Sequence, residues 1–210
     1  MNTLQSIGIF GGSFDPVHNG HVLVARAALE ELSLDRLFIV PAARSPFKPE
    51  QQPAAADVRL RLLRLAFAGE NRCELDTQEL DRDGVSYSID TLDEYTNRYP
   101  EAKLHYLIGA DHVPTLPQWR EAKRLAKLAR FVVVPRPGQE VAEFPEPFGG
   151  QALQGWPFEV SSSTIRQRLA LGQAPICRPA FPRIPSDVPP PGEPPCTRQS
   201  SVDLPGQRDV

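Results

Sequence analysis

Eleven residues near the N-terminus, GGSFDPVHNGH at positions 11–21, constrain the fold of this chain more than any other stretch. They follow a short apolar, β-prone run at 7–10, and apolar residues recur at helical spacing over 22–32. This pattern predicts a strand, a tight glycine turn and a helix. Glycines let the backbone approach a ligand closely, and the helix that follows presents free N–H groups and a partial positive charge. The turn therefore suits a phosphate.

Two histidines, His18 and His21, lie where the turn meets the helix. Because they are three positions apart, both imidazoles can face the same side of the helix and offer two donors to one anion. Gly20, between them, has no side chain to hold a triphosphate away from the helix start. A zinc site is disfavoured, because the other histidines are His105 and His112 and no cysteine pair at ligand spacing accompanies them.

Length and composition exclude several classes of protein. At 210 residues the chain is long enough for one domain with a substantial core. A net charge of −3 argues against a general nucleic-acid binder, and no stretch has the apolar length of a membrane span or the pattern of a signal peptide. We therefore expect a cytoplasmic protein without nucleic-acid or membrane partners. The three cysteines are irregularly spaced, which disfavours a disulfide framework.

The rest of the pattern predicts an α/β fold. An apolar run at 37–41 closely follows the first helix, so strand, helix and strand form a βαβ unit. We expect a Rossmann-like fold, in which helices flank a central, mainly parallel sheet. Capping rules make Asp57 the N-cap of the second helix, and Ser88 or Asp90 that of the third. Further strands are predicted at 72–76, 103–108, 131–134 and 158–160, and helices over 57–67, 88–99 and 121–129 and from 161 to a stop at Gly172.

The composition changes after the last predicted helix. Residues 1–172 are expected to form one domain, whereas prolines crowd residues 173–210 and no helical or strand period is left there. Such a segment buries too little apolar surface to offset the entropy of ordering, so we expect it to be disordered. The stretch 139–155 is rich in Pro, Gly and Phe, and the sequence assigns it no structure and no chemistry.

Polar residues follow several predicted strands, at the edge where open α/β sheets bind ligands. Arg44 and Lys48 lie in a proline-stiffened loop after the second strand. Asp111 follows the strand at 103–108, a position that suits binding of ribose hydroxyls. The helix that begins near 161 has several hydroxyl caps and carries Arg166 in its first turns.

The run GGSFDPVHNGH resembles the H-x-G-H signature of the nucleotidyltransferases, and in full it looks most like the bacterial nicotinate mononucleotide adenylyltransferases. Residues 161–168, SSSTIRQR, are similar to the second signature of that superfamily. The strings SYSIDTL at 86–92 and GADHVPTLPQW at 109–119 resemble substrate-side motifs of the same family. The resemblance implies a nucleotidyltransferase domain over 1–172 that transfers AMP from ATP to nicotinate mononucleotide, giving nicotinate adenine dinucleotide and pyrophosphate.

The resemblance also implies roles for particular residues. His18, His21, Lys48 and Arg166 would be catalytic, because they would stabilise the reacting phosphates without acting as nucleophiles. Backbone amides near Tyr87 would meet the nicotinate carboxylate, and Trp119 would stack on the pyridine ring. The implied ATP contacts are Gly11, Gly12, Ser13, Phe14, His18, His21, Gly109, Asp111, Ser162, Thr164 and Arg166. The implied contacts with the mononucleotide are Arg44, Ser86, Tyr87, Thr91, Asp111, Trp119 and Arg136.

Mg²⁺ would be held through the ATP phosphates, so no side chain is assigned as a metal ligand. The sequence leaves the oligomeric state open, and a homo-oligomer is compatible with it. Adenylyltransferases for nicotinamide mononucleotide or phosphopantetheine would share both signatures, although the strings around Tyr87 and Trp119 argue against the pantetheine substrate. The residues do not decide between the acid and the amide. A non-catalytic nucleotide sensor on the same fold is the alternative from another class.

An NAD-dependent oxidoreductase is disfavoured. It would require GxGxxG in the first turn and an acidic residue after the second strand to bind ribose. This chain has two adjacent glycines in the turn, and Pro-Ala-Ala-Arg follows that strand at 41–44.

Overall fold

A computed structural model describes residues 4–44, 52–82, 84–135, 142–155 and 160–173. The predictions for Lys48, for Arg136 and for the tail from 174 onward lie outside these residues. The described elements are β1 (Ser6–Gly12), α1 (Asn19–Glu31), β2 (Arg36–Pro41), α2 (Ala56–Ala66), β3 (Cys73–Leu75), α3 (Gln78–Asp81), α4 (Ser88–Arg98), β4 (Lys103–Gly109), the 3-10 helix η1 (Ala110–Gln118), α5 (Ala122–Leu128), β5 (Arg130–Val134), β6 (Gly150–Ala152) and α6 (Ser162–Ala170).

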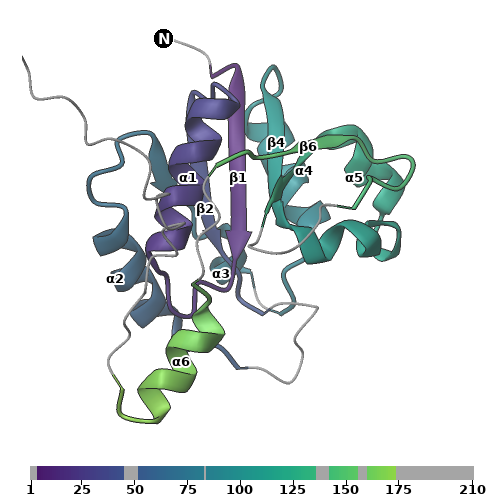
Figure 1. The fold of residues 1–210 in the computed structure, drawn as a ribbon. Coiled ribbons are helices and arrows are strands. Elements are labelled where there is room, and N and C mark those ends of the chain that lie inside the picture. The colour runs from purple at the N-terminus through teal and green to yellow at the C-terminus, as the bar shows by residue number, and fades with distance from the viewer. Residues whose placement is uncertain (1–3, 45–51, 83, 136–141, 156–159, 174–210) are drawn as a thin grey trace, which may run out of the picture. The chain divides into compact units, whose positions relative to one another are not determined.

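The described strands form one six-stranded sheet in the order β3-β2-β1-β4-β5-β6. Every neighbouring pair is parallel. The strand order reverses between β1 and β4, because β2 and β3 extend the sheet on one side and β5 and β6 on the other (Figure 1). This confirms the predicted α/β class with a central parallel sheet. Open parallel sheets bind ligands at the carboxyl ends of the strands beside such a reversal.

Helices cover both faces of the sheet, as the continuous apolar strands require. On one face, Ile9 and Phe131 pack with residues of α4, η1 and α5. On the other, Phe10 and Val132 pack with residues of α1 and α2. Adjacent residues of one strand therefore enter different cores, and both cores hold the strand ends in place around the reversal.

Two predicted helix caps are wrong. The N-cap of α2 is Ala55, and Asp57 lies inside the first turn, where it pairs with Arg61. The N-cap of α4 is Tyr87, without a side-chain cap bond. The Ser88 hydroxyl instead accepts a hydrogen bond from the Tyr106 hydroxyl at 2.9 Å. The Ser88 hydroxyl, which local rules assign to the helix cap, is therefore bonded to Tyr106 of β4 instead.

The strand predicted at 158–160 falls mostly outside the described residues. The sixth strand is β6, a three-residue strand inside the stretch to which the sequence assigns no structure. It pairs with β5 from Gly150 to Ala152. A Cβ at Gly150 would lie 2.1 Å from the carbonyl oxygen of Phe131, so only glycine allows this approach.

The last described helix begins and ends as predicted. The Ser161 hydroxyl accepts a hydrogen bond from the backbone N–H of Thr164 at 3.2 Å and caps α6. Gly172 follows the helix with a φ of 67°, in the left-handed region that favours glycine. The N–H groups of Gly172 and Gln173 return to the carbonyls of Leu169 and Arg168. These two bonds close the helix end.

Candidate active site

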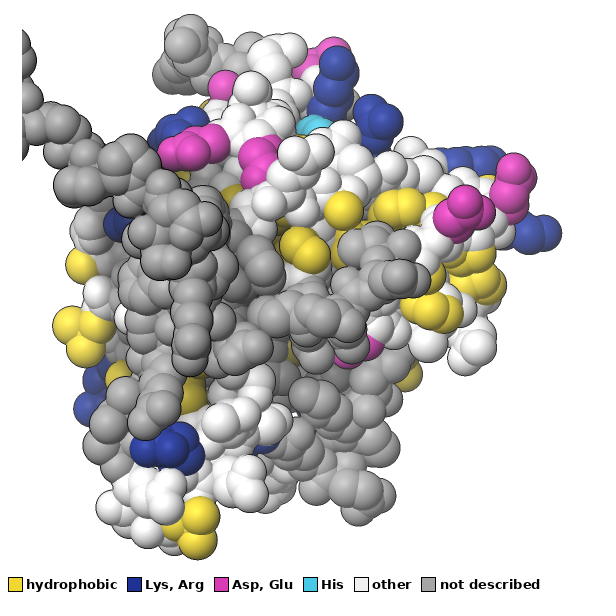
Figure 2. Space-filling view, in the orientation of Figure 1, with side chains coloured by type: hydrophobic (Ala, Val, Ile, Leu, Met, Phe, Trp, Pro, Cys, Tyr) yellow, Lys and Arg dark blue, Asp and Glu magenta, His cyan; other side chains and the backbone are white. Residues whose placement is uncertain are grey.

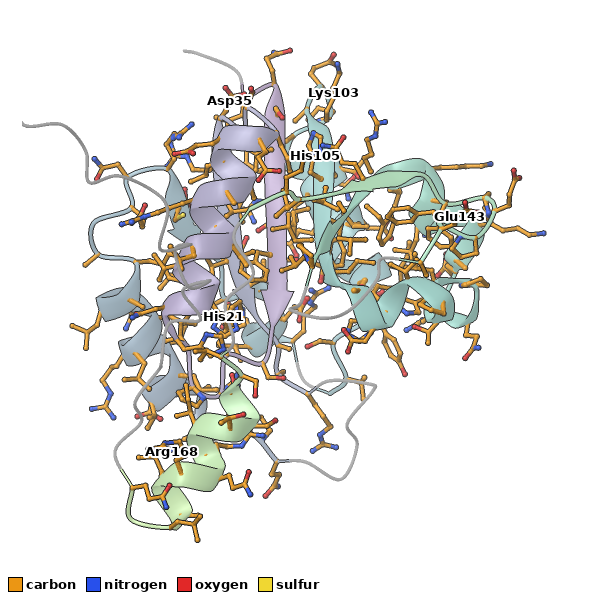
Figure 3. The ribbon with its side chains drawn as sticks, viewed as in Figure 1. His21, Asp35, Lys103, His105, Glu143 and Arg168 are labelled. Atoms are coloured by element: carbon orange, nitrogen blue, oxygen red, sulfur yellow. The ribbon has the colours of Figure 1, made fainter. Side chains whose placement is uncertain are left out.

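The polar residues of the glycine turn lie at the carboxyl end of β1, beside the reversal of strand order. Figure 3 shows His21 at the end of the sheet that faces α6, with Asp35, Lys103 and His105 at the opposite end. The phosphate-binding candidates from both signatures are therefore at one edge of the sheet.

His18 and His21 are brought together as predicted. His18 is the N-cap of α1, and the two imidazole rings stack with their centroids 3.8 Å apart and an interplanar angle of 27°. Nδ1 of His21 accepts a hydrogen bond from the backbone N–H of His18 at 3.1 Å. The backbone N–H of His21 donates to the carbonyl of His18 at 2.9 Å. The two histidines thus satisfy each other's backbone groups at the start of α1.

Both histidines are neutral near pH 7. Burial lowers the pKa of His18 to about 4. Burial, and then repulsion from His18, lower the pKa of His21 to about 3. Because Nδ1 of His21 is an acceptor, its single ring proton resides on Nε2, which makes that nitrogen a fixed donor. Nδ1 of His18 is buried and has no hydrogen-bond partner among the described residues.

The glycine turn is held against His21 by an aromatic contact. Phe14 has a φ of 44° and is 2% exposed, so an unfavourable backbone conformation is kept by a fully packed side chain. Its ring meets that of His21 edge to face, with centroids 4.9 Å apart. A Cβ at Gly12 would lie 3.3 Å from the Phe14 ring, and one at Gly11 would lie 3.3 Å from the Tyr106 hydroxyl. The two glycines therefore allow the turn to pack closely.

Helix α6 docks on this turn, although the two segments are far apart in the sequence. The Ser162 hydroxyl donates to the carbonyl of Pro16 at 2.8 Å. Nη1 of Arg166 donates to the carbonyl of Asp15 and lies 3.8 Å from the Asp15 carboxylate. The N-terminus of α6, with Thr164 exposed in its first turn, lies beside the start of α1. Two helix N-termini and the guanidinium of Arg166 thus surround one turn, an arrangement that stabilises a polyanion.

The predicted substrate side lies around the start of α4. Ser86 exchanges two hydrogen bonds with the chain beyond β2: its hydroxyl accepts from the N–H of Ala43, and its N–H donates to the carbonyl of Arg44, both at 3.0 Å. Arg44 is exposed beside this contact. The positive end of α4 is left without a side-chain cap.

Thr91 is fully buried, and its hydroxyl is engaged by protein groups. It donates to Glu79 at 2.6 Å and accepts from Arg82 at 3.0 Å. Glu79 is itself 5% exposed, and burial raises the pKa of its carboxyl group. Thr91 thus holds α3 against α4, and its direct contact with a substrate stays a prediction.

Trp119 and its neighbours form an aromatic group after β4. The Trp119 ring is edge-on to Tyr106, Phe131 and His112, and its indole N–H donates to the Thr115 hydroxyl at 3.3 Å. The guanidinium of the next residue, Arg120, lies 4.8 Å from the centroid of the Tyr87 ring. Asp111 is exposed in the first turn of η1, directly after Gly109. Residues from both substrate-side motifs are therefore neighbours at the sheet edge.

Sequence reasoning missed Arg59, the most buried cation among the described residues. It is 2% exposed and makes hydrogen bonds to three backbone carbonyls. Its position was a usable signal: Arg59 shares a helix face with Leu63 and Phe67, both buried, so the pattern places a charge on an apolar face. A charge in that position requires specific partners.

Charged side chains of both signs lie intermingled at the top and right of the face that Figure 2 shows, in keeping with the net charge of −3. Among the described residues no group of three His, Cys, Asp or Glu side chains could hold a metal ion. Nor does any helix in the described part of the chain have the length and apolar character needed to cross a membrane.

Comparison with known proteins agrees with this geometry. The sequence matches the family described as cytidylyltransferase-like over residues 9–168. A protein of Gloeobacter violaceus, curated under the name "Probable nicotinate-nucleotide adenylyltransferase", is 41% identical over 178 residues, which cover 81% of this chain and 86% of the relative. A relative of the same name from Gemmatimonas aurantiaca is 41% identical over 175 residues, covering 80% of this chain and 82% of the relative.

Solved structures with the same fold include the nicotinic acid mononucleotide adenylyltransferase of Plasmodium falciparum. In its complex with NaAD it superposes with a TM-score of 0.63 at 19% identity, covering 79% of this chain and 84% of the other. Its complex with APC gives a TM-score of 0.62. At this identity the likeness concerns the fold, and it matches the predicted Rossmann-like arrangement.

Proposed function

This chain belongs to the cytidylyltransferase-like family and, within it, to the nicotinate-nucleotide adenylyltransferases, and on that premise we propose how its site transfers AMP from ATP to nicotinate mononucleotide. The products are nicotinate adenine dinucleotide and pyrophosphate. The observation that carries the proposal is the stacked pair of neutral histidines at the start of α1, opposite the N-terminus of α6.

The triphosphate of ATP lies between the two helix starts in this proposal. Nε2 of His21, fixed as a donor, reaches a phosphate oxygen. A phosphate oxygen also supplies the missing partner of the buried Nδ1 of His18, when that nitrogen carries the ring proton. Arg166 contributes positive charge from the side of α6. Lys48, outside the described residues, is proposed to act on the same phosphates.

The chemical step needs no protein nucleophile. A phosphate oxygen of the mononucleotide attacks the α phosphorus of ATP, a new P–O bond forms, and the bond from the α phosphorus to the bridging oxygen breaks to release pyrophosphate. The protein aligns the two substrates and offsets the charge that grows on the phosphates. Mg²⁺ enters as part of the MgATP substrate, held by phosphate oxygens and water, in keeping with its preference for such ligands.

The acid, rather than the amide, is the proposed acceptor. The start of α4 carries the positive end of the helix dipole and has no side-chain cap, so it favours a carboxylate over a neutral carboxamide. The Arg120 guanidinium over Tyr87 adds positive charge nearby, which the Asp90 carboxylate at 3.9 Å partly offsets. Trp119 is proposed to stack on the pyridine ring, and Arg136, outside the described residues, to complete this side.

The test is pyrophosphate release by the purified protein with MgATP and, in separate reactions, nicotinate mononucleotide, nicotinamide mononucleotide and phosphopantetheine. We expect a strong preference for nicotinate mononucleotide. A folded protein that binds ATP but releases no pyrophosphate with any acceptor would contradict the proposal and favour a nucleotide sensor. The double variant His18→Ala/His21→Ala serves as the control, because it should be folded and nearly inactive.

A further inference from the structure

Arg59 occupies a position in α2 that the reaction scheme does not explain. Its guanidinium is buried, and it bonds to carbonyls from three separate segments of chain. Nε donates to Ala54 at 2.9 Å, and Nη1 donates to both Ser13 at 2.8 Å and Ala42 at 2.9 Å. The carboxylate of Asp15 is the nearby charge that favours the cation. A buried cation with this set of acceptors defines the relative positions of all three segments.

Two of these carbonyls mark the place where β1 and β2 part. The last bond of that ladder runs from the N–H of Ala42 to the carbonyl of Gly12 at 2.9 Å. One residue beyond the end of β1, at Ser13, begins the turn of residues 13–18 that leads to His18 and His21 and is called the histidine turn below. There the carbonyls of Ser13 and Ala42 have no strand partner, and Nη1 of Arg59 bridges them. Arg59 thus continues the connection between the two strands beyond the end of the ladder.

The residues after Ala42 carry this connection to the other half of the site. Ala43 and Arg44 exchange two hydrogen bonds with Ser86, directly before Tyr87 and the start of α4. A continuous path of hydrogen bonds therefore runs from the histidine turn through Arg59 and residues 42–44 to α4. The turn belongs to the side proposed for ATP, and α4 to the side proposed for the mononucleotide.

We propose that Arg59 is a positioning residue that sets the distance and orientation between the two substrates by bridging Ser13 and Ala42. The inference rests on the function proposed above. It predicts a particular kinetic effect, because each substrate keeps its own contacts when the bridge is lost. Binding of each substrate is then little changed, while their mutual alignment, on which the rate of an in-line displacement depends, is impaired.

The test compares Arg59→Lys with Leu63→Ala. Lysine keeps the positive charge but cannot place nitrogens at both the Nε and Nη1 positions. Leu63 lies one turn further along α2, is fully buried and takes no part in the hydrogen bonds of Arg59, so its truncation destabilises the same helix and the apolar core that it shares with Phe14 without breaking the bridge. We expect Arg59→Lys to lose about 10- to 100-fold in kcat, with each KM within about threefold of the wild-type value. Leu63→Ala should keep kcat within about twofold below its unfolding temperature.

A second variant breaks the same path at its other end and serves if Arg59→Lys does not fold. Ser86→Ala removes the hydroxyl that accepts from Ala43, and it should lower kcat with the same small effect on the KM for ATP, the substrate that Ser86 is not proposed to contact. In the double variant with Arg59→Lys, the loss should be no greater than that of the worse single variant, because one path is broken twice. Wild-type kcat in folded Arg59→Lys, an equal loss in Leu63→Ala, or losses that multiply in the double variant would overturn the inference.

Amide hydrogen exchange separates this inference from the proposed function, because it needs no turnover. Arg59→Lys should speed exchange in peptides that cover residues 12–19 and 84–90, whereas Leu63→Ala, which keeps the bridge, should leave 84–90 unchanged relative to the rest of the chain. Faster exchange in both peptides would support the bridge even if the wild-type protein released no pyrophosphate. Unchanged exchange in both would refute the bridge even if the enzyme were active.

Discussion

Replacing His21 by asparagine and, separately, by glutamine distinguishes the roles of its two ring nitrogens. The Oδ1 atom of asparagine lies near the position of Nδ1 and can accept the N–H of His18, but asparagine has nothing in place of Nε2. Glutamine reaches the position of Nε2 with its amide nitrogen, but it has no acceptor at Nδ1. His21→Asn should therefore keep the acceptor for the His18 N–H and lose the phosphate donor, and His21→Gln should do the reverse.

The structure gives the size of each effect. The bond from the His18 N–H to Nδ1 is a helix N-terminal cap, and losing such a cap costs about 1 kcal/mol, or about 2–4 °C in melting temperature for a chain of this size. The Nε2–H donor faces the phosphates in the proposed reaction, and losing one such donor lowers kcat by about 100- to 1,000-fold. His21→Asn should be stable and nearly inactive. His21→Gln should be less stable and retain more activity.

Thermal unfolding and pyrophosphate release on the same preparations test this pair. His105→Asn is the matched control, since His105 lies at the opposite end of the sheet and should keep its kcat within about twofold (Figure 3). His21→Asn with wild-type kcat would refute the assignment of Nε2 as the phosphate donor. A His21→Gln variant as stable as the wild type would refute the capping role of Nδ1.

Three further predictions follow from the described contacts. Burial lowers the pKa of His18 and His21 to about 4 and 3, below the ordinary value of 6.5, so the unfolded chain binds protons first as the pH falls. The stability that depends on their neutral forms should be complete above pH 6.5 and decline below it towards pH 3–4, and melting curves should show a weaker decline in His18→Asn/His21→Asn. Ser161→Ala removes the cap of α6 and should lower the unfolding free energy by about 1 kcal/mol, measured by urea titration. Thr91→Val deprives the buried carboxylate of Glu79 of a donor and should cost about 1–3 kcal/mol in the same titration, whereas an unchanged midpoint would show that this bond contributes nothing.

The sequence predicted the elements whose signals are local. The apolar runs of β1, β2, β4 and β5 identify strands buried on both faces, and the glycine turn predicts the start of α1. The hydroxyl cap and the glycine stop of α6 were also predictable, because each depends on one residue near the helix end. The stacking of His18 on His21 follows from their spacing once the helix start is fixed.

The features that the sequence did not predict depend on partners far along the chain. Ser88 has the chemistry of a cap, but Tyr106 takes its hydroxyl. Arg59 finds its acceptors only in the folded chain, where the carbonyls of Ser13 and Ala42 lie side by side beyond the ends of β1 and β2. The strand β6 has no apolar run that would predict it. Its position depends instead on its ladder with β5 and on the missing side chain of Gly150. No local rule contains these contacts.

The docking of α6 on the first turn has a consequence for biosynthesis. Ser162 meets Pro16 across 146 positions, and Arg166 meets Asp15 across 151. A ribosome releases β1 through β5 before it releases α6, so a nascent chain can pair those strands while Ser162 and Arg166, which are proposed to contact the phosphates, are still being made. If α6 binds the phosphates as proposed, adenylyl transfer begins only after translation has passed Arg166, and a nonsense codon upstream of Ser162 leaves the sheet without that helix.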